Sequence, residues 1–296
     1  MSGTPAPAHR FRLGPLLGRG AFGEVVRAFD RELGEWVALK RCHGGKGLDA
    51  LATEHAALAT IRHPNVVRAG VWVRGEQWCG YSMALVEGPD AREWVRGATV
   101  ERDEATPRRN LPMAFGQELQ DVGESCYRAL SGERLDRLRT VLCDLSEALE
   151  AVHAANLLHL DVNPENVRVA GGRAVLLDLG LARPQGRSTD ARTLGSAAYG
   201  APELGARPPT PASDFYSLGV LAFELLLGER PFEGGGPEVL IRKQSLEASR
   251  PSELDAAVPP DLDAICVGLL QRLPSRRMDG AGLRAVLAHI ERPPVR

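Results

Sequence analysis

Only three of the 36 cationic residues in this 296-residue chain are lysines, so chemistry that needs an ammonium group must use Lys40, Lys46 or Lys243. Lys40 ends the apolar run 37–39, which is typical of a strand, and Glu54 lies in the helical stretch that follows. A lysine at a strand end is usually a solvated surface residue. Paired with Glu54, however, its ammonium could be held over the α- and β-phosphates of a nucleotide.

Asp161, Asn166 and Asp178 carry oxygens at a spacing that suits phosphate chemistry. Asp161 can accept a proton from a hydroxyl group, and Asn166, five residues on, can offer an amide oxygen to a metal. Asp178 follows the apolar run 175–177, and this position suits Mg²⁺, which prefers few protein carboxylates together with phosphate oxygens. A single aspartate at a strand end is more often a turn former, so Asp178 alone decides nothing.

A glycine-rich segment places Gly18, Gly20 and Gly23 between Leu17 and Val25. Glycines at this spacing let the backbone of a strand–turn–strand unit approach phosphate oxygens closely. In a chain with 32 glycines, an ordinary hairpin explains the segment about equally well. The segment precedes a predicted strand rather than a helix, which disfavours a dinucleotide-binding fold.

The elements that must position these groups form a β-rich part and a helical part. We predict strands around 25–26, 36–39 and 81–86 and a helix over 49–61, which makes residues 11–86 a small β-rich lobe. After a hinge at 87–89, residues 87–290 show helices over 134–152, 217–227, 258–273 and 282–290 and a hairpin of strands 167–169 and 175–177. Residues 97–133 are predicted to be an irregular insertion, residues 1–10 a flexible tail and residues 291–296 a second tail. The fold class is therefore α+β, in one bilobal unit.

The composition excludes several classes of protein. A formal net charge of −2 lacks the basic surplus that binding of nucleic-acid phosphates requires. No stretch approaches the roughly 20 apolar residues of a membrane helix, and residues 1–10 lack the apolar core of a signal peptide. The five cysteines are odd in number and contain no C-x-x-C pair, which argues against a disulfide framework or a zinc site. We expect a cytoplasmic protein with no nucleic-acid partner and no membrane segment.

In their order and spacing, these motifs resemble those of a eukaryotic-type (Hanks-type) bacterial serine/threonine protein kinase over residues 11–290. The matching segments are G-x-G-x-x-G-x-V at 18–25, V-A-L-K at 37–40, Glu54, the loop residues Asp161 and Asn166, D-L-G at 178–180, A-P-E at 201–203, D-x-x-S-x-G at 214–219 and Arg277. The resemblance implies the bilobal protein-kinase fold. It also implies transfer of the γ-phosphoryl group of ATP, with Mg²⁺, to serine or threonine hydroxyls of protein substrates.

The resemblance assigns roles residue by residue. Lys40 and Glu54 would position the triphosphate, Asp161 would orient the acceptor hydroxyl, and Asn166 and Asp178 would hold Mg²⁺. The residues expected to bind the nucleotide are Leu17, Gly18, Gly20, Phe22, Gly23, Val25, Ala38, Lys40, Met83, Leu85 and Arg168. Ser196 would line the acceptor site, residues 214–219 would support the catalytic loop, and Glu203 with Arg277 would form a buried structural ion pair.

Three residues depart from the family pattern. Asn163, to which we also assign a catalytic role, stands where serine/threonine kinases carry a lysine that neutralises the γ-phosphate. By comparison with the loss of one oxyanion-hole donor, this costs about 10²–10³ in rate, so we expect a slow enzyme. Either Asn163 donates a neutral hydrogen bond in place of the lysine, or another group such as an arginine supplies the charge. Arg168 takes the place of an apolar residue under the adenine, and its guanidinium either stacks on the base or crowds the pocket. Leu160 replaces an arginine that binds a phosphate on the activation segment, so this switch is expected to be dispensable.

Two other functions compete with that of an active protein kinase. A nucleotide-binding pseudokinase, acting as a scaffold or regulatory switch, has no need to keep Lys40, Asp161, Asn166 and Asp178 together, and all four are present. A small-molecule kinase of related fold is disfavoured by the segments 201–203 and 214–219, which resemble features of kinases that act on peptides.

Overall fold

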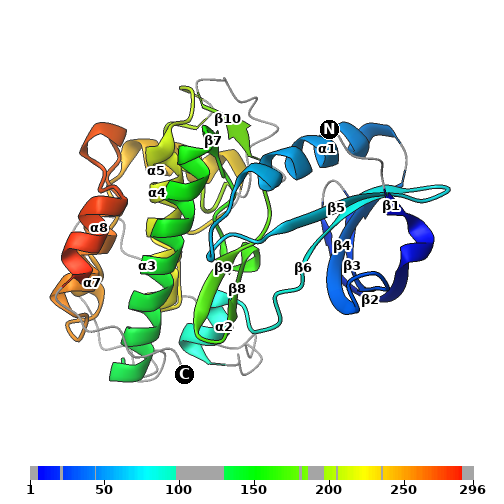
Figure 1. Ribbon diagram of the computed structural model, residues 1–296. Helices are drawn as coiled ribbons and strands as arrows, with labels where there is room; N and C mark the ends of the chain where they lie inside the picture. Colours follow the sequence, from blue (N-terminus) through cyan, green and yellow to red (C-terminus); the bar gives the residue numbers. More distant parts are fainter. Residues whose placement is uncertain are drawn as a thin grey trace.

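The chain folds into a β-sheet part and a helical part, joined where the chain passes from β6 to α2 (Figure 1). The computed structural model describes residues 6–20, 23–43, 45–97, 130–179, 182–185, 197–204, 206–234 and 236–288. Strands β1–β6 and helix α1 make up the smaller part, and helices α2–α8 dominate the larger one. The predicted bilobal α+β fold is confirmed.

One six-stranded sheet, in the order β1–β5–β6–β4–β3–β2, forms the smaller part. Its strands are β1 (Ala6–Pro7), β2 (Phe11–Gly20), β3 (Gly23–Asp30), β4 (Glu35–Cys42), β5 (Ala69–Arg74) and β6 (Cys79–Ala84). Helix α1 (Gly45–Thr60) packs on β4, β5 and β6. It contains residues 49–60 of the predicted helix 49–61 but begins earlier in the chain, and it ends before Pro64, in keeping with the backbone preference of a residue preceding proline.

The two faces of this sheet differ because successive side chains of a strand point in opposite directions. Val26, Ala28, Val37 and Leu39 are buried together with Phe11 in a small core on one face. The alternate residues of β4, Ala38 and Lys40, therefore project from the other face of the sheet. Burial of one face fixes the register of β3 and β4, because a slip by one residue would move the buried apolar side chains to the opposite face of the sheet.

The prediction of a flexible tail is wrong for residues 6–10. Ala6 lies opposite Val73 in the parallel β1–β5 pair, and the 3₁₀ helix η1 (Ala8–Arg10) follows. The Arg10 guanidinium then donates to both carboxylate oxygens of Asp30, at 2.7 and 2.6 Å, and the Asp30 side chain is fully buried. This bidentate ion pair orders a segment whose composition resembles that of a loop.

The larger part consists of helices around two short sheets. The helices are α2 (Ala91–Arg96), α3 (Gly132–Ala154), α4 (Pro211–Leu227), α5 (Gly236–Ser245), α6 (Pro251–Leu254), α7 (Pro260–Leu269) and α8 (Gly280–Leu287). In one sheet β8 (Val167–Ala170) pairs with β9 (Arg173–Leu176), and in the other β7 (Leu157–Leu158) pairs with β10 (Arg183–Pro184). Two 3₁₀ turns, η2 (Pro164–Asn166) and η4 (Pro274–Arg276), complete this part. The predicted hairpin of β8 and β9 is confirmed, with Gly171 and Gly172 in its turn at positive φ.

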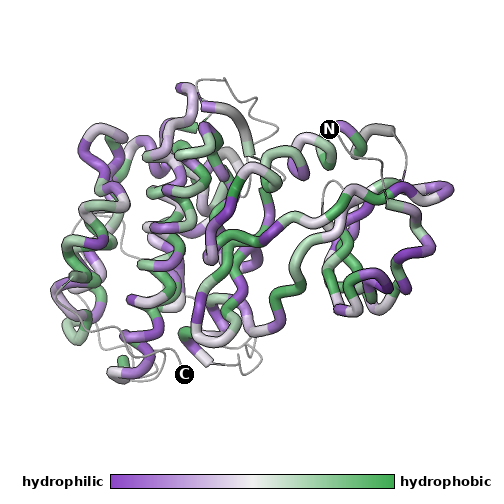
Figure 2. The backbone as a smooth tube through the Cα atoms, in the orientation of Figure 1, coloured by the Kyte–Doolittle hydropathy of each residue, from purple (hydrophilic) through white to green (hydrophobic). Residues whose placement is uncertain are grey.

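Helices α3 and α4 begin at side-chain caps. The Ser131 hydroxyl accepts a hydrogen bond from the backbone N–H of Arg134 at the start of α3. At the start of α4 the backbone N–H of Thr210 donates to the Ser213 hydroxyl at 3.1 Å, and the helix ends at Gly228 in the left-handed conformation with φ 91°. Hydrophilic and hydrophobic residues alternate along α3 (Figure 2), whereas α4 is buried on all sides, which explains its nearly continuous apolar sequence.

The structure also changes several predicted boundaries. Residues 98–129 of the predicted insertion lie outside the described residues, and its last two residues belong to α3. Helix α7 ends at Leu269 instead of residue 273, and the turn η4 follows. The predicted tail 291–296 lies outside the described residues. Helices α2, α5 and α6 were not predicted, although Asp90 caps the first turn of α2 by accepting from the N–H of Glu93.

The expected buried ion pair between Glu203 and Arg277 is confirmed. Two parallel hydrogen bonds of 2.8 and 3.0 Å join the guanidinium to the carboxylate, and the two side chains are 0% and 5% exposed. The Ser213 hydroxyl donates to the same carboxylate at 2.8 Å. The pair therefore fixes the A-P-E segment to α4 and η4.

Arg277→Met is expected to lower the free energy of unfolding by about 3–5 kcal/mol, because the Glu203 carboxylate then remains buried without its cation. Combining this change with Glu203→Gln is expected to recover part of the loss. Urea unfolding of the wild type and the two variants measures both values. A single variant as stable as the wild type would contradict the structural role of this pair.

Candidate active site

Four of the predicted nucleotide-binding residues share one face of the sheet. Val25 lies opposite Lys40 in the β3–β4 ladder, and Met83 lies opposite Ala38 in the β4–β6 ladder. Cross-strand partners project from the same face, and residues 38 and 40 do so because they are two positions apart. This is the face away from the small core of Val26 and Leu39.

Lys40 connects three elements of the fold. Its ammonium nitrogen Nζ donates to Oε1 of Glu54 at 2.8 Å and lies 2.8 Å from each carboxylate oxygen of Asp178. Glu54 comes from α1, and Asp178 follows β9 in the larger part. The Lys40 and Glu54 side chains are 7% and 2% exposed, whereas that of Asp178 is 39% exposed. The structure therefore brings three predicted site residues together, with Asp178 on the solvent side.

The charges in this group are strongly coupled. Burial acts to lower the pKa of Lys40, but the Glu54 and Asp178 carboxylates outweigh it and raise that pKa, so the ammonium remains charged. Burial raises the pKa of Glu54 to about 7, even though Lys40 acts in the opposite direction. Glu54 therefore takes up a proton more readily than a solvated glutamate does.

Glu54→Gln is expected to remove a pH dependence of stability. Because its pKa is raised from 4.5 to about 7, the folded protein binds more protons here than the unfolded chain, and stability is lost as the pH rises through this window. The loss is on the order of 3 kcal/mol. Urea unfolding of the wild type and Glu54→Gln from about pH 5 to 8 measures this contribution as the pH dependence of the difference in stability between the two proteins. Parallel curves would contradict the raised pKa.

In the glycine-rich segment, position 23 has no room for a side chain. Gly23 has φ 146°, and a Cβ there would lie 2.2 Å from the carbonyl oxygen of Arg41 on β4. A Cβ on Gly18 would meet nothing within 4 Å, so that strand is open at this point. Gly20 ends β2 and Leu17 is 47% exposed, whereas Phe22 lies outside the described residues.

The loop before β8 joins Asp161 to Asn166. The amide nitrogen of Asn166 donates to carboxylate oxygen Oδ2 of Asp161 at 2.8 Å and to the Asp161 backbone carbonyl at 2.9 Å. These bonds orient the Asp161 carboxylate. Because the nitrogen is engaged by Asp161, the amide oxygen of Asn166 is the atom that remains for a cation.

Asn163 is engaged within the same loop. Its amide oxygen accepts from the N–H groups of Glu165 and Asn166 at 2.9 and 3.2 Å, and its amide nitrogen donates to the Asp161 carbonyl at 3.1 Å. The side chain is 8% exposed and caps η2. The Asn163 side chain therefore holds Asp161 and Asn166 in place, and the hydrogen bond expected from it to a γ-phosphate would use the second N–H of its amide.

Asp214 at the start of α4 supports this loop, as the resemblance implies. Its fully buried carboxylate accepts from the backbone N–H groups of Leu160 and His159 at 2.7 and 2.9 Å and contacts Nε2 of His153 at 2.8 Å. Leu160 has φ 62°, a conformation that costs about 1–3 kcal/mol for a residue other than glycine. The Asp214 contacts hold that strained backbone in place, and the Leu160 side chain is buried.

The predicted hinge packs tightly on β8. A Cβ on Gly88 would lie 1.9 Å from the carbonyl oxygen of Val169, and the N–H of Val169 donates to the Pro89 carbonyl at 2.9 Å. Arg168 directs its guanidinium to the Gly88 carbonyl at 3.4 Å, and Leu85 is half-buried just before the hinge. The guanidinium thus lies against the hinge backbone.

The oxygen donors of the site fit Mg²⁺. Asn166 and Asp178 supply an amide oxygen and a carboxylate, the hard ligands that Mg²⁺ combines with phosphate oxygens and water. In the part of the chain that the structure describes, no three His, Cys, Asp or Glu side chains form a metal-binding group. A magnesium ion held by Asn166 and Asp178 would therefore take further ligands from a phosphate or from water.

Lys243 has a structural setting that no motif indicated. Its ammonium on α5 donates to the backbone carbonyls of Ala197, Ala198 and Gly200 at 3.0, 2.8 and 2.8 Å. The residue is 1% exposed and lies 5.4 Å from the centre of the Tyr216 ring. The scarcity of lysine was its only sequence signal. Ser196, the expected acceptor-site residue just before this segment, lies outside the described residues.

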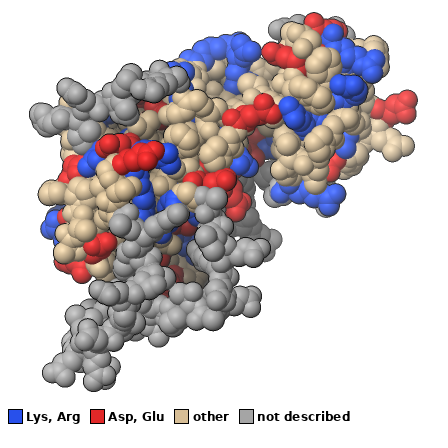
Figure 3. Space-filling model, turned by 90° about the horizontal axis from the view of Figure 1, so that it is seen from below, with Lys and Arg blue, Asp and Glu red and all other residues tan. Residues whose placement is uncertain are grey.

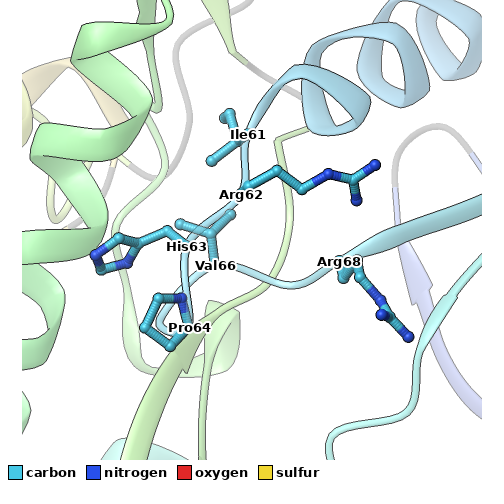
Figure 4. A pocket seen from close by; sticks show the side chains of 6 residues that line it. All are labelled: Ile61, Arg62, His63, Pro64, Val66 and Arg68. Atoms are coloured by element: carbon cyan, nitrogen blue, oxygen red, sulfur yellow. The ribbon is translucent and has the colours of Figure 1, made fainter.

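A hollow of about 200 Å³ lies apart from these residues, where the chain leaves α1 and enters β5. Its lining comes from one short segment and contains no carboxylate (Figure 4): Ile61, Arg62, His63, Pro64, Val66 and Arg68. None of the predicted site residues contributes to it, so it is not the candidate active site.

The molecular surface mixes charges of both signs. On the face shown in Figure 3, cationic and anionic side chains are interspersed with uncharged residues. Among the helices in the described ranges, none combines the length and the apolar character that a bilayer crossing demands.

The fold and this group of residues define the class of protein. The protein kinase domain model matches residues 11–289, and the chain belongs to this family. It is 30% identical over 292 residues to a probable serine/threonine-protein kinase of Streptomyces coelicolor, covering 92% of this chain and 38% of the relative. Serine/threonine-protein kinase PkaA of the same organism is 31% identical (93% and 48% covered), and PknB of Mycobacterium leprae is 29% identical (99% and 45% covered). The chain thus spans less than half the length of these relatives.

Proposed function

We propose that this chain is an ATP-dependent protein kinase that transfers the γ-phosphoryl group of ATP to serine or threonine hydroxyls of protein substrates. The contact of Lys40 with both Glu54 and Asp178 carries the proposal, because it joins the sheet, α1 and the segment after β9 at one cation. Asp161 and Asn166 are oriented together in the neighbouring loop. Membership of the protein kinase family supports the assignment.

We place the kinase domain at residues 11–290, with lobes 11–86 and 87–290. This division is supported by the change from the six-stranded sheet to the helical part at the hinge. Thiols at Cys42, Cys79 and Cys266 that form no disulfide among the described residues support the expected location in the reducing cytoplasm.

The Lys40 ammonium positions the triphosphate in this proposal. Glu54 is buried and keeps its contact with Lys40, whereas Asp178 is partly exposed and gives way to phosphate oxygens. Because phosphate oxygens replace the Asp178 carboxylate, the Lys40 ammonium has an anionic partner both before and after the nucleotide binds. The released Asp178 carboxylate and the Asn166 amide oxygen would then hold Mg²⁺, which neutralises phosphate charge when bound.

The Asp161 carboxylate receives the proton of the acceptor hydroxyl. Its oxygen Oδ2 is held by the Asn166 amide nitrogen at 2.8 Å, which leaves Oδ1 for the hydroxyl. Asn163 carries no positive charge, and one of its two amide N–H groups is already bonded to the Asp161 carbonyl. By analogy with the loss of an oxyanion-hole donor, the chemical step is expected to be about 10²–10³ slower than with a lysine there.

The lack of a positive charge at Asn163 also favours one second function, a nucleotide-binding pseudokinase that serves as a scaffold or switch. Such a protein would bind ATP through Lys40 and Asp178 without transferring phosphate. The two functions differ in a single observable, the appearance of phosphoserine or phosphothreonine.

Mass spectrometry of phosphorylated residues tests the proposed function. The full chain is treated with a phosphatase, repurified, and incubated with ATP, Mg²⁺ and a serine/threonine peptide library. We expect new phosphoserine or phosphothreonine in the chain or the peptides with the wild type and none with Asp161→Asn. Asp136→Asn, which changes a half-exposed residue of α3 paired with Arg139, is the matched control and is expected to behave as the wild type. ATP binding without any phosphorylated residue would favour the pseudokinase.

A further inference from the structure

Two cysteines face each other at the end of the β4–β6 ladder. Cys42 is the last residue of β4, Cys79 is the first residue of β6, and their Cα atoms are register partners. Both are free thiols. Because cross-strand partners project from one face, the two sulfur atoms lie on the same side of the sheet.

The backbone spacing at this pair suits a disulfide. Antiparallel partners have Cα separations of about 4.5 or 5.5 Å, and both lie within the roughly 4.4–6.8 Å of disulfides. The neighbouring Gly80 brings the strands close, since a Cβ there would lie 2.2 Å from the Lys40 carbonyl oxygen. The pair also ends the ladder, between the bend at His43 and the turn closed by the 2.9 Å bond from the Gly75 N–H to the Trp78 carbonyl. The pair therefore lies where the strands end, and the backbone there can adjust as the bond closes.

The two thiols differ in their access to solvent. Cys42 is 5% exposed, whereas Cys79 is only half-buried. Burial raises the pKa of the Cys42 thiol, and the neighbouring Cys79 raises it further. A small oxidant therefore reaches Cys79 first, and Cys42 stands beside it as the second thiol. Cys143 and Cys266 are buried in the helical part, on α3 and α7.

We propose that Cys42 and Cys79 form a modification site at which a hydroperoxide converts the two thiols into a disulfide. The Cys79 sulfur attacks the peroxide, the O–O bond breaks, and a sulfenic acid and water (or an alcohol) result. The Cys42 sulfur then attacks the Cys79 sulfur, the S–S bond forms as the S–O bond breaks, and the hydroxyl leaves as water with the Cys42 proton. Two electrons pass from the thiols to the peroxide, and a dithiol reductant reverses the change.

The bond would close a loop that contains α1 and β5 and would join strands that are already partners. Closing a loop restricts the unfolded chain, so the oxidised protein is expected to unfold at a higher temperature than the reduced one. This site uses no residue of the proposed phosphoryl transfer and does not depend on that function.

Peptide mapping of the full chain tests the proposal. The reduced protein is treated with one equivalent of hydrogen peroxide, alkylated and digested. We expect a Cys42–Cys79 linked peptide with a mass lower by two hydrogen atoms than its separate thiol peptides, and its loss after treatment with dithiothreitol. Cys79→Ser should abolish this peptide. Cys126→Ser, the matched control, should leave it unchanged, because Cys126 is not part of the pair.

Three results would overturn the proposal. They are a Cys79 bond to Cys126, a Cys79 bond to a second chain, and sulfinic acid at Cys79 together with a Cys42 thiol that is still open to alkylation.

The temperature of unfolding gives a second measurement that needs no variant at the buried Cys42. A rise on oxidation of the wild type that is absent in Cys79→Ser supports the native-state bond, and a fall contradicts it.

Discussion

Lys40→Met is expected to weaken the binding of ATP by roughly tenfold to a hundredfold and to stop phosphoryl transfer. Methionine has a similar shape but no charge, so it provides none of the hydrogen bonds that the ammonium would make to phosphate oxygens. Hydrogen bonds to charged groups contribute about 1.5–3 kcal/mol each, which corresponds to this loss of affinity. Glu54 and Asp178 would also lose their shared cation and repel an incoming triphosphate.

Isothermal titration of the full chain with ATP and Mg²⁺ measures this effect. Arg41→Met is the matched control, because Arg41 is the next residue of β4, projects from the opposite face and pairs with Glu24 at 2.9 Å. This control is expected to bind ATP as the wild type does. Equal affinities of Lys40→Met and the wild type would show that the ammonium does not bind the triphosphate.

Lys243→Met is expected to have the second largest effect, a loss of about 3 kcal/mol or more in the free energy of unfolding. Three carbonyls of the segment 197–200 would lose their donor, and unpaired buried polar groups cost about 1–3 kcal/mol each. Hydrogen exchange of this segment is expected to rise. Lys243→Gln keeps two N–H donors and should lie between the wild type and the methionine variant. Equal stability of all three proteins would contradict the structural role of Lys243.

The deficit of Lys243→Met is also expected to grow with pH. Burial lowers the pKa of Lys243 from 10.5 to about 7, so the folded protein binds fewer protons here than the unfolded chain between these two values. Stability from this residue therefore rises with pH in that window, by about 2 kcal/mol between pH 7 and 9. Urea unfolding of the wild type and Lys243→Met at both pH values measures the difference. A deficit that stays constant or shrinks would contradict the lowered pKa.

The chemistry of the site could be predicted because its signals are local. The lysine at the end of β4, the Asp161 and Asn166 pair and the aspartate after β9 each stand within a few residues of the strand or turn that positions them. Their approach to one another follows from the fold, which the same motifs indicated through the family resemblance. The sheet also followed the apolar alternation around Val26 and Leu39, because burial of one face determines its register.

The features that could not be predicted depend on partners far away in the chain. Residues 6–10 look like a tail until Arg10 meets Asp30. Lys243 needs the carbonyls of residues 197–200, and nothing in its own neighbourhood indicates them. The capping role of Asn163 has the same origin. An amide oxygen can cap a turn in many contexts, and only the position of the Glu165 and Asn166 N–H groups shows that it does so here.

The initial rate of γ-phosphate transfer from labelled ATP in the presence of Mg²⁺ tests the central claim most directly. The wild type, Asp161→Asn and Asp136→Asn are compared at saturating ATP on the same peptide substrate. We predict a slow but measurable rate for the wild type and the Asp136→Asn control, and a rate at least about 10²-fold lower for Asp161→Asn, since general-base catalysis contributes this much. Transfer by Asp161→Asn at the wild-type rate, or no transfer by any of the three proteins, would contradict the assignment of this site to phosphoryl transfer.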